Sequence, residues 1–147
     1  GMNRMSSLER TLTLTVPSAT ENLALIREFV ANVGSQAGLG DDDVAKLELA
    51  VDEACANVIE HAHGHDRNKE VTVRATFDTA TLRIEVVDEG EGFDPTVVPS
   101  TSVEQMVHDR RTGGLGLRVM KSLMDEVSYE IVPGERNRLR LLKRIQK

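Results

Sequence analysis

Polar and apolar side chains alternate strictly over residues 11–16, which predicts a β-strand with one buried face. Pro17 then ends the strand, and Ser18 offers a cap to a following helix. The same reasoning predicts a hairpin around the polar pair at 78–79 and a second pair of strands around a turn at 133–136. The five predicted strands cover residues 11–16, 71–77, 82–87, 127–132 and 139–142.

Apolar side chains recur every three or four residues in three other stretches, which predicts amphipathic helices. The first helix closes at glycines 34 and 38. The second covers about 44–61, with Asp41 or Asp42 as its cap, and the third covers 115–124. The apolar face of the first helix consists of Leu23, Ile26, Phe29, Val30 and Val33, and that of the second of Val44, Leu47, Val51, Ala54, Cys55, Val58 and Ala62.

The order of elements is one strand, two helices, two strands, a loop, one helix and two strands. Hairpins next to helices predict an α+β fold, a two-layer sandwich in which an antiparallel or mixed sheet carries helices on one face. The segment 94–112 contains two prolines and little periodicity, which favours a mobile loop able to cover a ligand. We expect a single domain over residues 2–147, with Gly1 as a residue left by tag removal.

The composition is that of an ordinary folded domain, with 147 residues, 39% hydrophobic and 29% charged side chains. The net charge of −6 argues against nucleic-acid binding through a general basic field. The basic stretch at 136–144 contains alternating Leu139 and Leu141, which favours a strand with one solvated face over a nucleic-acid patch.

The single cysteine excludes an internal disulfide, and the first thirty residues contain no pattern typical of a signal peptide. No apolar stretch approaches the roughly 20 residues that a membrane-spanning helix needs. We therefore expect a cytoplasmic protein that would reach a membrane only through a partner.

Two glycine-rich segments carry the candidate chemistry. Asp88, Gly90 and Gly92 follow the predicted strand at 82–87 and offer a carboxylate beside flexible backbone. The segment 112–117 opens the last helix, where clustered N–H groups and the helix dipole favour an anion. Together they offer the two kinds of surface that adenine and phosphate require, so a nucleotide site is indicated.

Glu53 and Asn57 add a carboxylate and an amide one helical turn apart. At 3.6 residues per turn they lie about 40 degrees apart, beside the apolar face of the helix rather than within it. Together with Lys46 and Glu60 they could equally form a solvated helix face, and periodicity alone leaves both interpretations open.

These motifs, in this order, resemble the Bergerat-fold ATPase and kinase superfamily, which includes gyrase, the ninety-kilodalton heat-shock chaperones, mismatch-repair ATPases and histidine kinases. Within it, Glu-Ala-Cys-Ala-Asn-Val-Ile-Glu-His-Ala at 53–62, Gly-Gly-Leu-Gly-Leu at 113–117 and Met-Asp-Glu-Val at 124–127 are most similar to the bacterial anti-sigma factor serine kinases. The resemblance covers nearly the whole chain. It implies the Bergerat ATP-binding fold, with ATP and Mg²⁺ as cofactors.

The resemblance also implies a role for each motif residue. Asp88 would accept a hydrogen bond from the exocyclic amine of adenine, and Gly90 and Gly92 would let the backbone approach the base. Asn57 would bind Mg²⁺ through its side-chain oxygen. Glu53 would act as the general base of phosphoryl transfer.

The second glycine segment is implied to bind the phosphates through backbone N–H groups. Arg110 and Arg111, directly before it, are either phosphate ligands or ordinary solvated loop residues. Thr112 either contacts the nucleotide or caps the helix. The nucleotide-binding residues expected after it are Gly113, Gly114, Leu115, Gly116 and Leu117.

Three histidines, His61, His63 and His65, follow the end of the second predicted helix. Their alternation by two scatters the imidazoles and no cysteine accompanies them, so a metal site is disfavoured. A favourable interaction with the negative end of the helix dipole is sufficient reason for them. His63 stands where the family often has an aromatic residue, which leaves its packing open.

By this resemblance the protein would transfer the γ-phosphate of ATP to a serine of an anti-anti-sigma antagonist and would sequester a sigma factor, as a partner-switching regulator. The chain has no room for the helical phospho-acceptor domain of a histidine kinase, so we expect it to act on another protein. Two alternatives stay open: an ATP-dependent binding module without phosphoryl transfer, and an isolated histidine-kinase-like catalytic domain. The family also suggests a homodimer.

Overall fold

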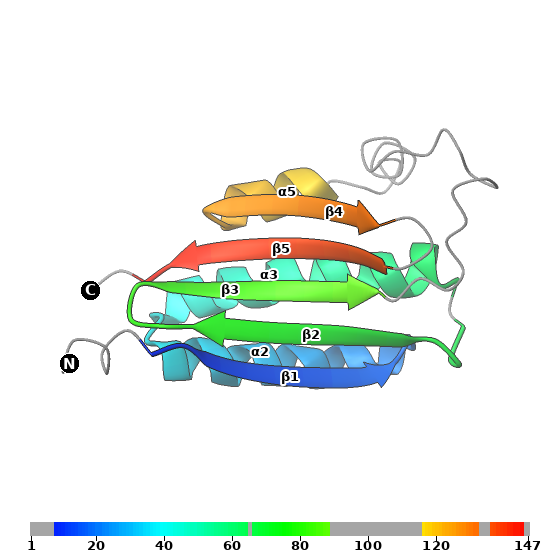
Figure 1. The fold of residues 1–147 in the computed structure, drawn as a ribbon, viewed down its shortest axis with the longest axis horizontal. Helices are drawn as coiled ribbons and strands as arrows, with labels where there is room; N and C mark the ends of the chain where they lie inside the picture. The colour runs from blue at the N-terminus through cyan, green and yellow to red at the C-terminus, as the bar shows by residue number, and fades with distance from the viewer. Residues whose placement is uncertain (1–7, 65, 89–115, 133–135, 146–147) are drawn as a thin grey trace.

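The computed structural model describes residues 8–64, 66–88, 116–132 and 136–145. Within these residues the strands form one sheet in the order β1-β2-β3-β5-β4 (Figure 1). Every neighbouring pair in this sheet is antiparallel. The strands are β1 (Arg10–Pro17), β2 (Glu70–Phe77), β3 (Thr81–Asp88), β4 (Glu126–Val132) and β5 (Arg136–Arg144).

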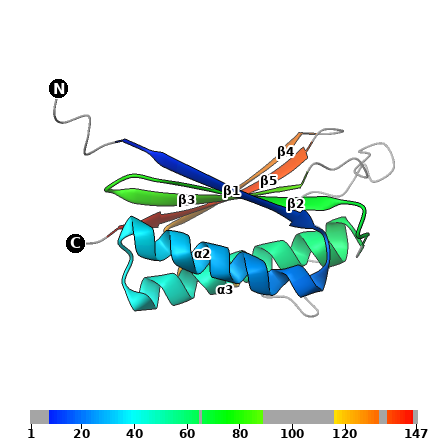
Figure 2. The ribbon, with the colours of Figure 1, turned by 90° about the horizontal axis from the view of Figure 1, so that it is seen from below.

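The helices cover one face of this sheet. Figure 2 shows α2 and α3 beside each other beneath the strands, and α5 contacts α3. The predicted α+β sandwich is therefore confirmed, and the sheet is antiparallel rather than mixed. The helices are the 3-10 helix η1 (Thr20–Asn22), α2 (Leu23–Ala37), α3 (Asp41–Asn57), the π-helix η2 (Val58–Ala62) and α5 (Gly116–Leu123).

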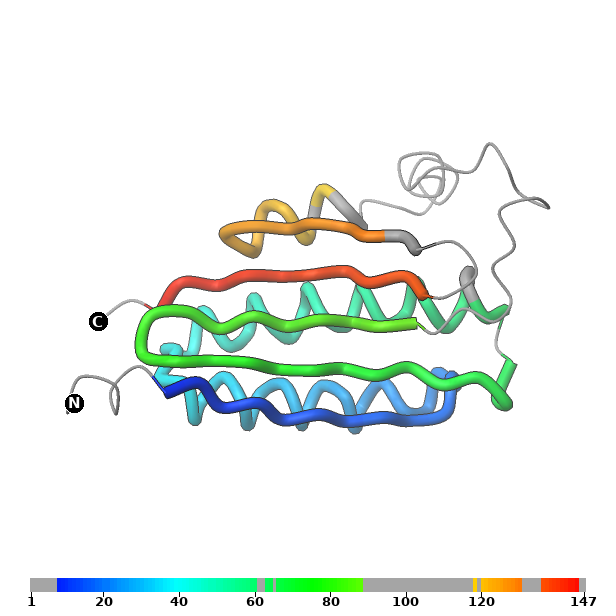
Figure 3. Tube along the Cα trace, in the orientation of Figure 1, coloured from blue at the N-terminus to red at the C-terminus, as the bar shows by residue number. Residues whose placement is uncertain are grey.

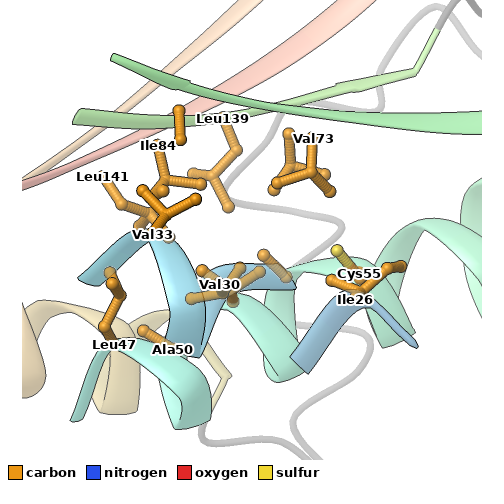
Figure 4. Close-up of a cluster of buried hydrophobic side chains, with 14 of the residues drawn as sticks. Ile26, Val30, Val33, Leu47, Ala50, Cys55, Val73, Ile84, Leu139 and Leu141 are labelled. Atoms are coloured by element: carbon orange, nitrogen blue, oxygen red, sulfur yellow. The ribbon is translucent and has the colours of Figure 1, made fainter. Parts of the chain in front are cut away.

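The core lies between the inner face of the sheet and helices α2 and α3 (Figure 4). Ile26 of α2 and Leu47 of α3 are fully buried, as are Ile84 of β3 and Leu141 of β5. Cys55 is part of the same core, as its place on the apolar face of the helix predicts, and burial raises the pKa of its thiol. Because strands and helices both bury their predicted faces, the hydrophobic pattern accounts for the packing of the two layers.

The outer face of the sheet is polar and carries one buried carboxylate. Glu85 of β3 is 6% exposed, and the guanidinium groups of Arg138, Arg140 and Arg74 lie 3.2, 3.1 and 3.7 Å from its carboxylate oxygens. Burial alone would raise the pKa of Glu85, but hydrogen bonds from Arg140 and Arg138 hold that pKa below its ordinary value. The arginines of β5 therefore form a charged strand face, while Leu139 and Leu141 are buried on the other side.

Two predictions about α3 are wrong. The helix begins with Gly40 as its cap, so neither Asp41 nor Asp42 has that role. These aspartates lie instead in the first turn, where the positive end of the helix dipole stabilises them. The predicted single helix at 44–61 changes after Asn57 into the π-helix η2, a local widening that often marks functional positions.

Other boundaries differ for identifiable reasons. Gly38 ends α2 in the left-handed conformation, at φ 100°, as predicted, whereas Gly34 lies inside the helix. Ser18 caps neither η1 nor α2, and its hydroxyl binds His63 instead. Strand β5 begins three residues before its predicted start at Leu139, because it pairs with β3 on one side and β4 on the other, as Figure 3 traces.

Candidate nucleotide-binding site

Asp88 is the last residue of β3, where the sequence predicted it just beyond the strand. Its carboxylate is 2% exposed and is held from two sides. Nδ2 of Asn137, the residue opposite on β5, donates to Oδ2 at 3.3 Å, and Nε2 of His63 contacts Oδ1. A buried carboxylate without such donors would be strongly destabilising, so both neighbours are needed to keep Asp88 inside the protein.

The structure decides the packing of His63, which the sequence left open, because this residue is buried. Only 5% of the residue is exposed, and its second nitrogen, Nδ1, lies 2.8 Å from the hydroxyl of Ser18. At the end of η2 the imidazole therefore makes two specific hydrogen bonds that the sequence did not predict. Ser18 is itself fixed, because its backbone N–H donates to the carbonyl of Lys69 at 2.8 Å.

Ser18, His63 and Asp88 are the residue types of a hydrolase triad, but their placement argues against that chemistry. The three residues are 0%, 5% and 2% exposed, so a substrate carbonyl has no route to the serine hydroxyl. An active nucleophile must meet its substrate, and such residues lie in accessible clefts. The cluster is instead a buried polar support for Asp88.

Glu53 and Asn57 are both partly buried on α3, in contrast to the exposed Lys46 and Glu60 of the proposed solvated face. The side-chain oxygen Oδ1 of Asn57 is buried and has no hydrogen-bond partner within the part of the chain that the structure describes. Buried polar atoms are nearly always paired, so an unpaired amide oxygen indicates a missing ligand. A hard cation such as Mg²⁺, which prefers oxygen ligands, fits this atom.

No cluster of three or more His, Cys, Asp and Glu side chains in the described ranges could hold a metal by itself. His63 uses both ring nitrogens on Ser18 and Asp88, so it is not available to a cation. His65 and the side chain of His61 lie outside the description. A cation at Asn57 would therefore draw its other ligands from a bound nucleotide or from water, the usual arrangement for Mg²⁺.

The fold connects these two halves of the site. Helix η2 continues directly from Asn57, and its last turn is closed by a hydrogen bond from the N–H of His63 to the carbonyl of Val58. The C-terminal part of α3 and the end of β3 consequently lie at the same side of the molecule (Figure 1). The structure thus brings the turn after Asn57 to Asp88 through the His63 contact.

Part of the predicted site lies outside the described residues. Gly116 begins α5, one residue after the predicted start of that helix, and the side chain of Leu117 is not described. Their phosphate-binding roles stay predictions, as do those of the neighbouring segments. The predicted residues that fall outside the described ranges are Gly90, Gly92, Arg110, Arg111, Thr112, Gly113, Gly114 and Leu115.

The sequence pattern did not identify Asn137, interpreted Ser18 as a helix cap and left the packing of His63 open. Only the register of β3 and β5 places Asn137 opposite Asp88, and a pattern of buried and exposed positions does not specify register between strands distant in the chain. Ser18 and His63 are 45 residues apart. A polar residue directly after a strand was the only available signal, and it pointed to a helix cap.

Comparison with known proteins supports an ATP-binding domain. Residues 16–143 match the family described as the histidine kinase-like ATPase domain. The serine-protein kinase RsbW of Bacillus subtilis is 37% identical over 123 residues, which cover 78% of this chain and 74% of that protein. Its counterpart from Staphylococcus aureus is 33% identical over 136 residues, covering 88% of this chain and 85% of that protein.

Solved structures share the fold. A chain of the SiaB–SiaC complex from Pseudomonas aeruginosa has a TM-score of 0.63 at 15% identity and covers 95% of this chain and 91% of that chain. The crystal structure of the RsbU and RsbW domains of a Mycobacterium tuberculosis protein has a TM-score of 0.66 at 18% identity. It covers 92% of this chain but 32% of that longer chain, so the match is to one region of it.

The chain belongs to the histidine kinase-like ATPase domain family, within the group that contains these RsbW serine-protein kinases. Membership implies the use of ATP. No helix in the described ranges has the length and apolar character needed to cross a bilayer.

Proposed function

We propose that this protein is an ATP-dependent serine kinase that phosphorylates a serine of an anti-anti-sigma antagonist and sequesters a sigma factor in a partner-switching circuit. One observation carries the proposal: Glu53 and the unpaired Asn57 oxygen lie one turn apart on α3, and η2 joins that helix to the buried Asp88. The identity of 33 to 37% to serine-protein kinases supports the choice of serine as acceptor.

Asp88 recognises adenine in this proposal. An ionised carboxylate can accept several hydrogen bonds, and His63 and Asn137 leave part of that capacity for the 6-amino group of the base. A hydrogen bond to a charged acceptor typically contributes about 1.5 to 3 kcal/mol. Guanine has an oxo group at that position, so the contact selects adenine.

Asn57 holds the cation. Its unpaired side-chain oxygen supplies one ligand, and the phosphate oxygens of the nucleotide supply others. When bound, Mg²⁺ neutralises charge on the β- and γ-phosphates during transfer. The role of Asn57 is to bind and orient, and it moves no proton.

Glu53 acts as the general base. The hydroxyl oxygen of the acceptor serine attacks the γ-phosphorus, the bond to the leaving oxygen of ADP breaks, and the hydroxyl proton passes to the Glu53 carboxylate. A partly buried position beside the core suits this task, because the carboxylate can meet a docked substrate while the helix keeps its backbone fixed.

The glycine segment at 113–117, with Arg110, Arg111 and Thr112, would bind the phosphates at the start of α5. Backbone N–H groups at a helix N-terminus favour anions, and arginine side chains pair well with phosphate oxygens. A homodimer and a cytoplasmic location belong to the same proposal. The homodimer rests on the family resemblance, and the location rests on the sequence analysis.

Incubation with γ-labelled ATP and candidate antagonist domains tests the proposal. We expect an acid-stable label on a serine of the antagonist, and loss of transfer by about 10² to 10⁴-fold in Glu53→Gln, with ATP affinity retained in calorimetry. Glu28→Gln, which changes an exposed carboxylate on α2, is the matched control and should transfer normally.

Other outcomes would favour the alternatives. ATP binding without label on any partner would favour a nucleotide-dependent binding module. An acid-labile label on a separately supplied helical hairpin that carries a histidine would favour a histidine-kinase-like catalytic domain. Transfer at near wild-type rates by the Glu53 variant would refute the assignment of the base.

A further inference from the structure

His63 has no part in the proposed chemistry, yet it is the residue that joins α3 to the adenine-recognising carboxylate. Both of its ring nitrogens are used, Nδ1 on the Ser18 hydroxyl at 2.8 Å and Nε2 on Oδ1 of Asp88. The side chains of His63 and Asp88 are 1% and 3% exposed. A buried polar chain of this kind specifies one arrangement of its members, because each alternative leaves a polar atom unpaired.

The partners determine where the imidazole carries its hydrogen. An ionised carboxylate only accepts, so Nε2 must be the donor toward Asp88. In the neutral ring Nδ1 is then an acceptor, and the hydroxyl of Ser18 donates to it. With a neutral ring, the hydrogen bonds therefore run in one direction, from Ser18 through His63 to Asp88.

This chain restricts the rotation of the Asp88 carboxylate. His63 holds Oδ1 from the side of η2, and Asn137 holds Oδ2 from β5 at 3.3 Å. With one donor on each oxygen the carboxylate plane has a defined orientation, and each oxygen keeps a lone pair for another donor. A group that is oriented before binding loses less entropy when the ligand arrives.

We propose that His63, oriented by Ser18, is a positioning residue that sets the Asp88 carboxylate for the 6-amino group of adenine and thereby determines the preference for adenine nucleotides. The inference rests on the proposed function, since it requires that Asp88 meets the base. The alternative is that His63 only provides hydrogen-bond partners for buried polar atoms and so stabilises the fold.

Two nucleotides separate these interpretations. ATP and purine riboside triphosphate differ only by the 6-amino group, so their affinity ratio reports the contact at Asp88. A fold defect would weaken both nucleotides alike. A misplaced carboxylate would weaken ATP alone.

Dissociation constants of both nucleotides are measured by calorimetry for the wild-type protein and for His63→Phe, His63→Gln and Ser18→Ala. His63→Phe fills similar space without a donor, so the dissociation constant of ATP should rise about tenfold while that of purine riboside triphosphate changes less than about twofold. Glutamine can still donate to Asp88, and His63→Gln should recover most of the preference for ATP. Ser18→Ala should give a smaller loss than His63→Phe, and the exposed Thr13→Ala on β1 should give none.

A nitrogen-detected NMR spectrum of the wild-type protein provides a readout that needs no variant. The inference expects the His63 ring to carry hydrogen on Nε2, and a ring with hydrogen on Nδ1 alone would overturn it. This measurement stands even where His63→Phe fails to fold.

The outcomes distinguish the inference from the proposal beneath it. If the wild-type protein binds both nucleotides equally, Asp88 does not read the 6-amino group and the adenine assignment fails together with the inference. If the wild-type protein prefers ATP and His63→Phe keeps that preference, or loses affinity for both nucleotides alike, the positioning role of His63 alone is refuted.

Discussion

Strand β3 carries two buried carboxylates on opposite faces of the sheet, and the side chains that contact them differ. Glu85, on the outer face, is 6% exposed and meets three guanidinium groups. Asp88, at the strand end, is 2% exposed and meets an imidazole and an amide. The two residues share a strand, a charge type and a degree of burial, so their partners are the main difference between them.

The difference fits a structural role for Glu85 and the ligand-binding role proposed for Asp88. Three arginine side chains more than neutralise the negative charge of Glu85, so we do not expect this carboxylate to bind a ligand. Asp88 receives one donor on each oxygen and no arginine among its described contacts, which leaves it able to accept from a ligand. Residues that are incompletely compensated in the free protein are typical of binding sites.

Ile84→Ala should have the largest effect, because it should destabilise the strand that carries both Glu85 and Asp88. Ile84 directly precedes Glu85 on β3, is fully buried and faces the core. Removal of its side chain should cost about 2 to 5 kcal/mol of unfolding free energy through lost burial and a cavity. Urea unfolding followed by circular dichroism measures this, and a loss below 1 kcal/mol would show that the core reorganises around β3.

Asp88→Asn should affect ligand binding far more than stability. Loss of the charged acceptor should raise the ATP dissociation constant by roughly 10 to 150-fold, corresponding to about 1.5 to 3 kcal/mol. The free energy of unfolding should change by less than about 1 kcal/mol, because asparagine keeps the shape, its oxygen still accepts from Asn137, and its amide group can donate to Nε2 of His63 once the ring hydrogen moves to Nδ1. Calorimetry and urea unfolding on the same samples check the two expectations, and an unchanged dissociation constant would contradict the role of Asp88.

Glu85→Gln should show the reverse pattern. We expect a loss of about 1 to 2 kcal/mol of unfolding free energy, a modest value because Arg74 and Arg140 are partly hydrated. ATP affinity should stay unchanged within about twofold, since Glu85 lies on the face away from the helices. A rise in the dissociation constant comparable to that of Asp88→Asn would show that the two faces are coupled.

The stability difference between wild-type protein and Glu85→Gln should also depend on pH. The pKa of Glu85 is lowered in the folded state, so its carboxylate stabilises the protein above the ordinary glutamate pKa of 4.5. That contribution is lost as pH falls through the lowered value. Unfolding curves between pH 7 and pH 3 should therefore converge on acidification, and a constant difference would exclude the ion pairs as its source.

Asp78→Ala should have the smallest effect and sharpens the comparison with an exposed carboxylate. Asp78 accepts hydrogen bonds from the backbone N–H groups of Ala80 and Thr81 at 2.8 and 2.9 Å in the turn between β2 and β3. These bonds lower its pKa. The variant should lose less than about 1 kcal/mol at neutral pH, and the loss should vanish on acidification below the ordinary aspartate pKa of 3.8. Thermal unfolding at neutral pH and at a pH below the lowered pKa of Asp78 measures this loss. Glu9→Ala, which changes an exposed carboxylate directly before β1, is the control and should show no such loss.

Much of the fold could be predicted from the order of residues. The alternation over 11–16 gave a strand within one residue at each end, and Gly38 marked the end of α2. Errors arose where local signals competed. Ser18 resembles a cap in sequence, but its hydroxyl is hydrogen-bonded to the buried imidazole of His63 instead. A continuous helical pattern across Asn57 concealed the π-helix, because its five residues are too few to change the apolar spacing visibly.

The candidate site, like the fold, could be predicted from the sequence only in part. Glu53, Asn57 and Asp88 could be identified from the sequence, because their residue types and their spacing resemble those of the family. Partial burial of Glu53 and Asn57, and the unpaired oxygen on Asn57, distinguish them from the solvated face that periodicity allowed equally well. The partners of Asp88 were not predictable, since His63 and Asn137 lie 25 and 49 residues away from it in the chain.

The sequence by itself determined which residues face the core, the α+β arrangement and the presence of a carboxylate at the end of β3. Those properties depend on local periodicity and on residue chemistry, which every segment carries with it. Only the tertiary structure decided that Asp88 is held by His63 and Asn137 while Glu85 is surrounded by arginines. Contacts of this kind depend on strand register and on where a helix ends, and the packing of the whole domain specifies both.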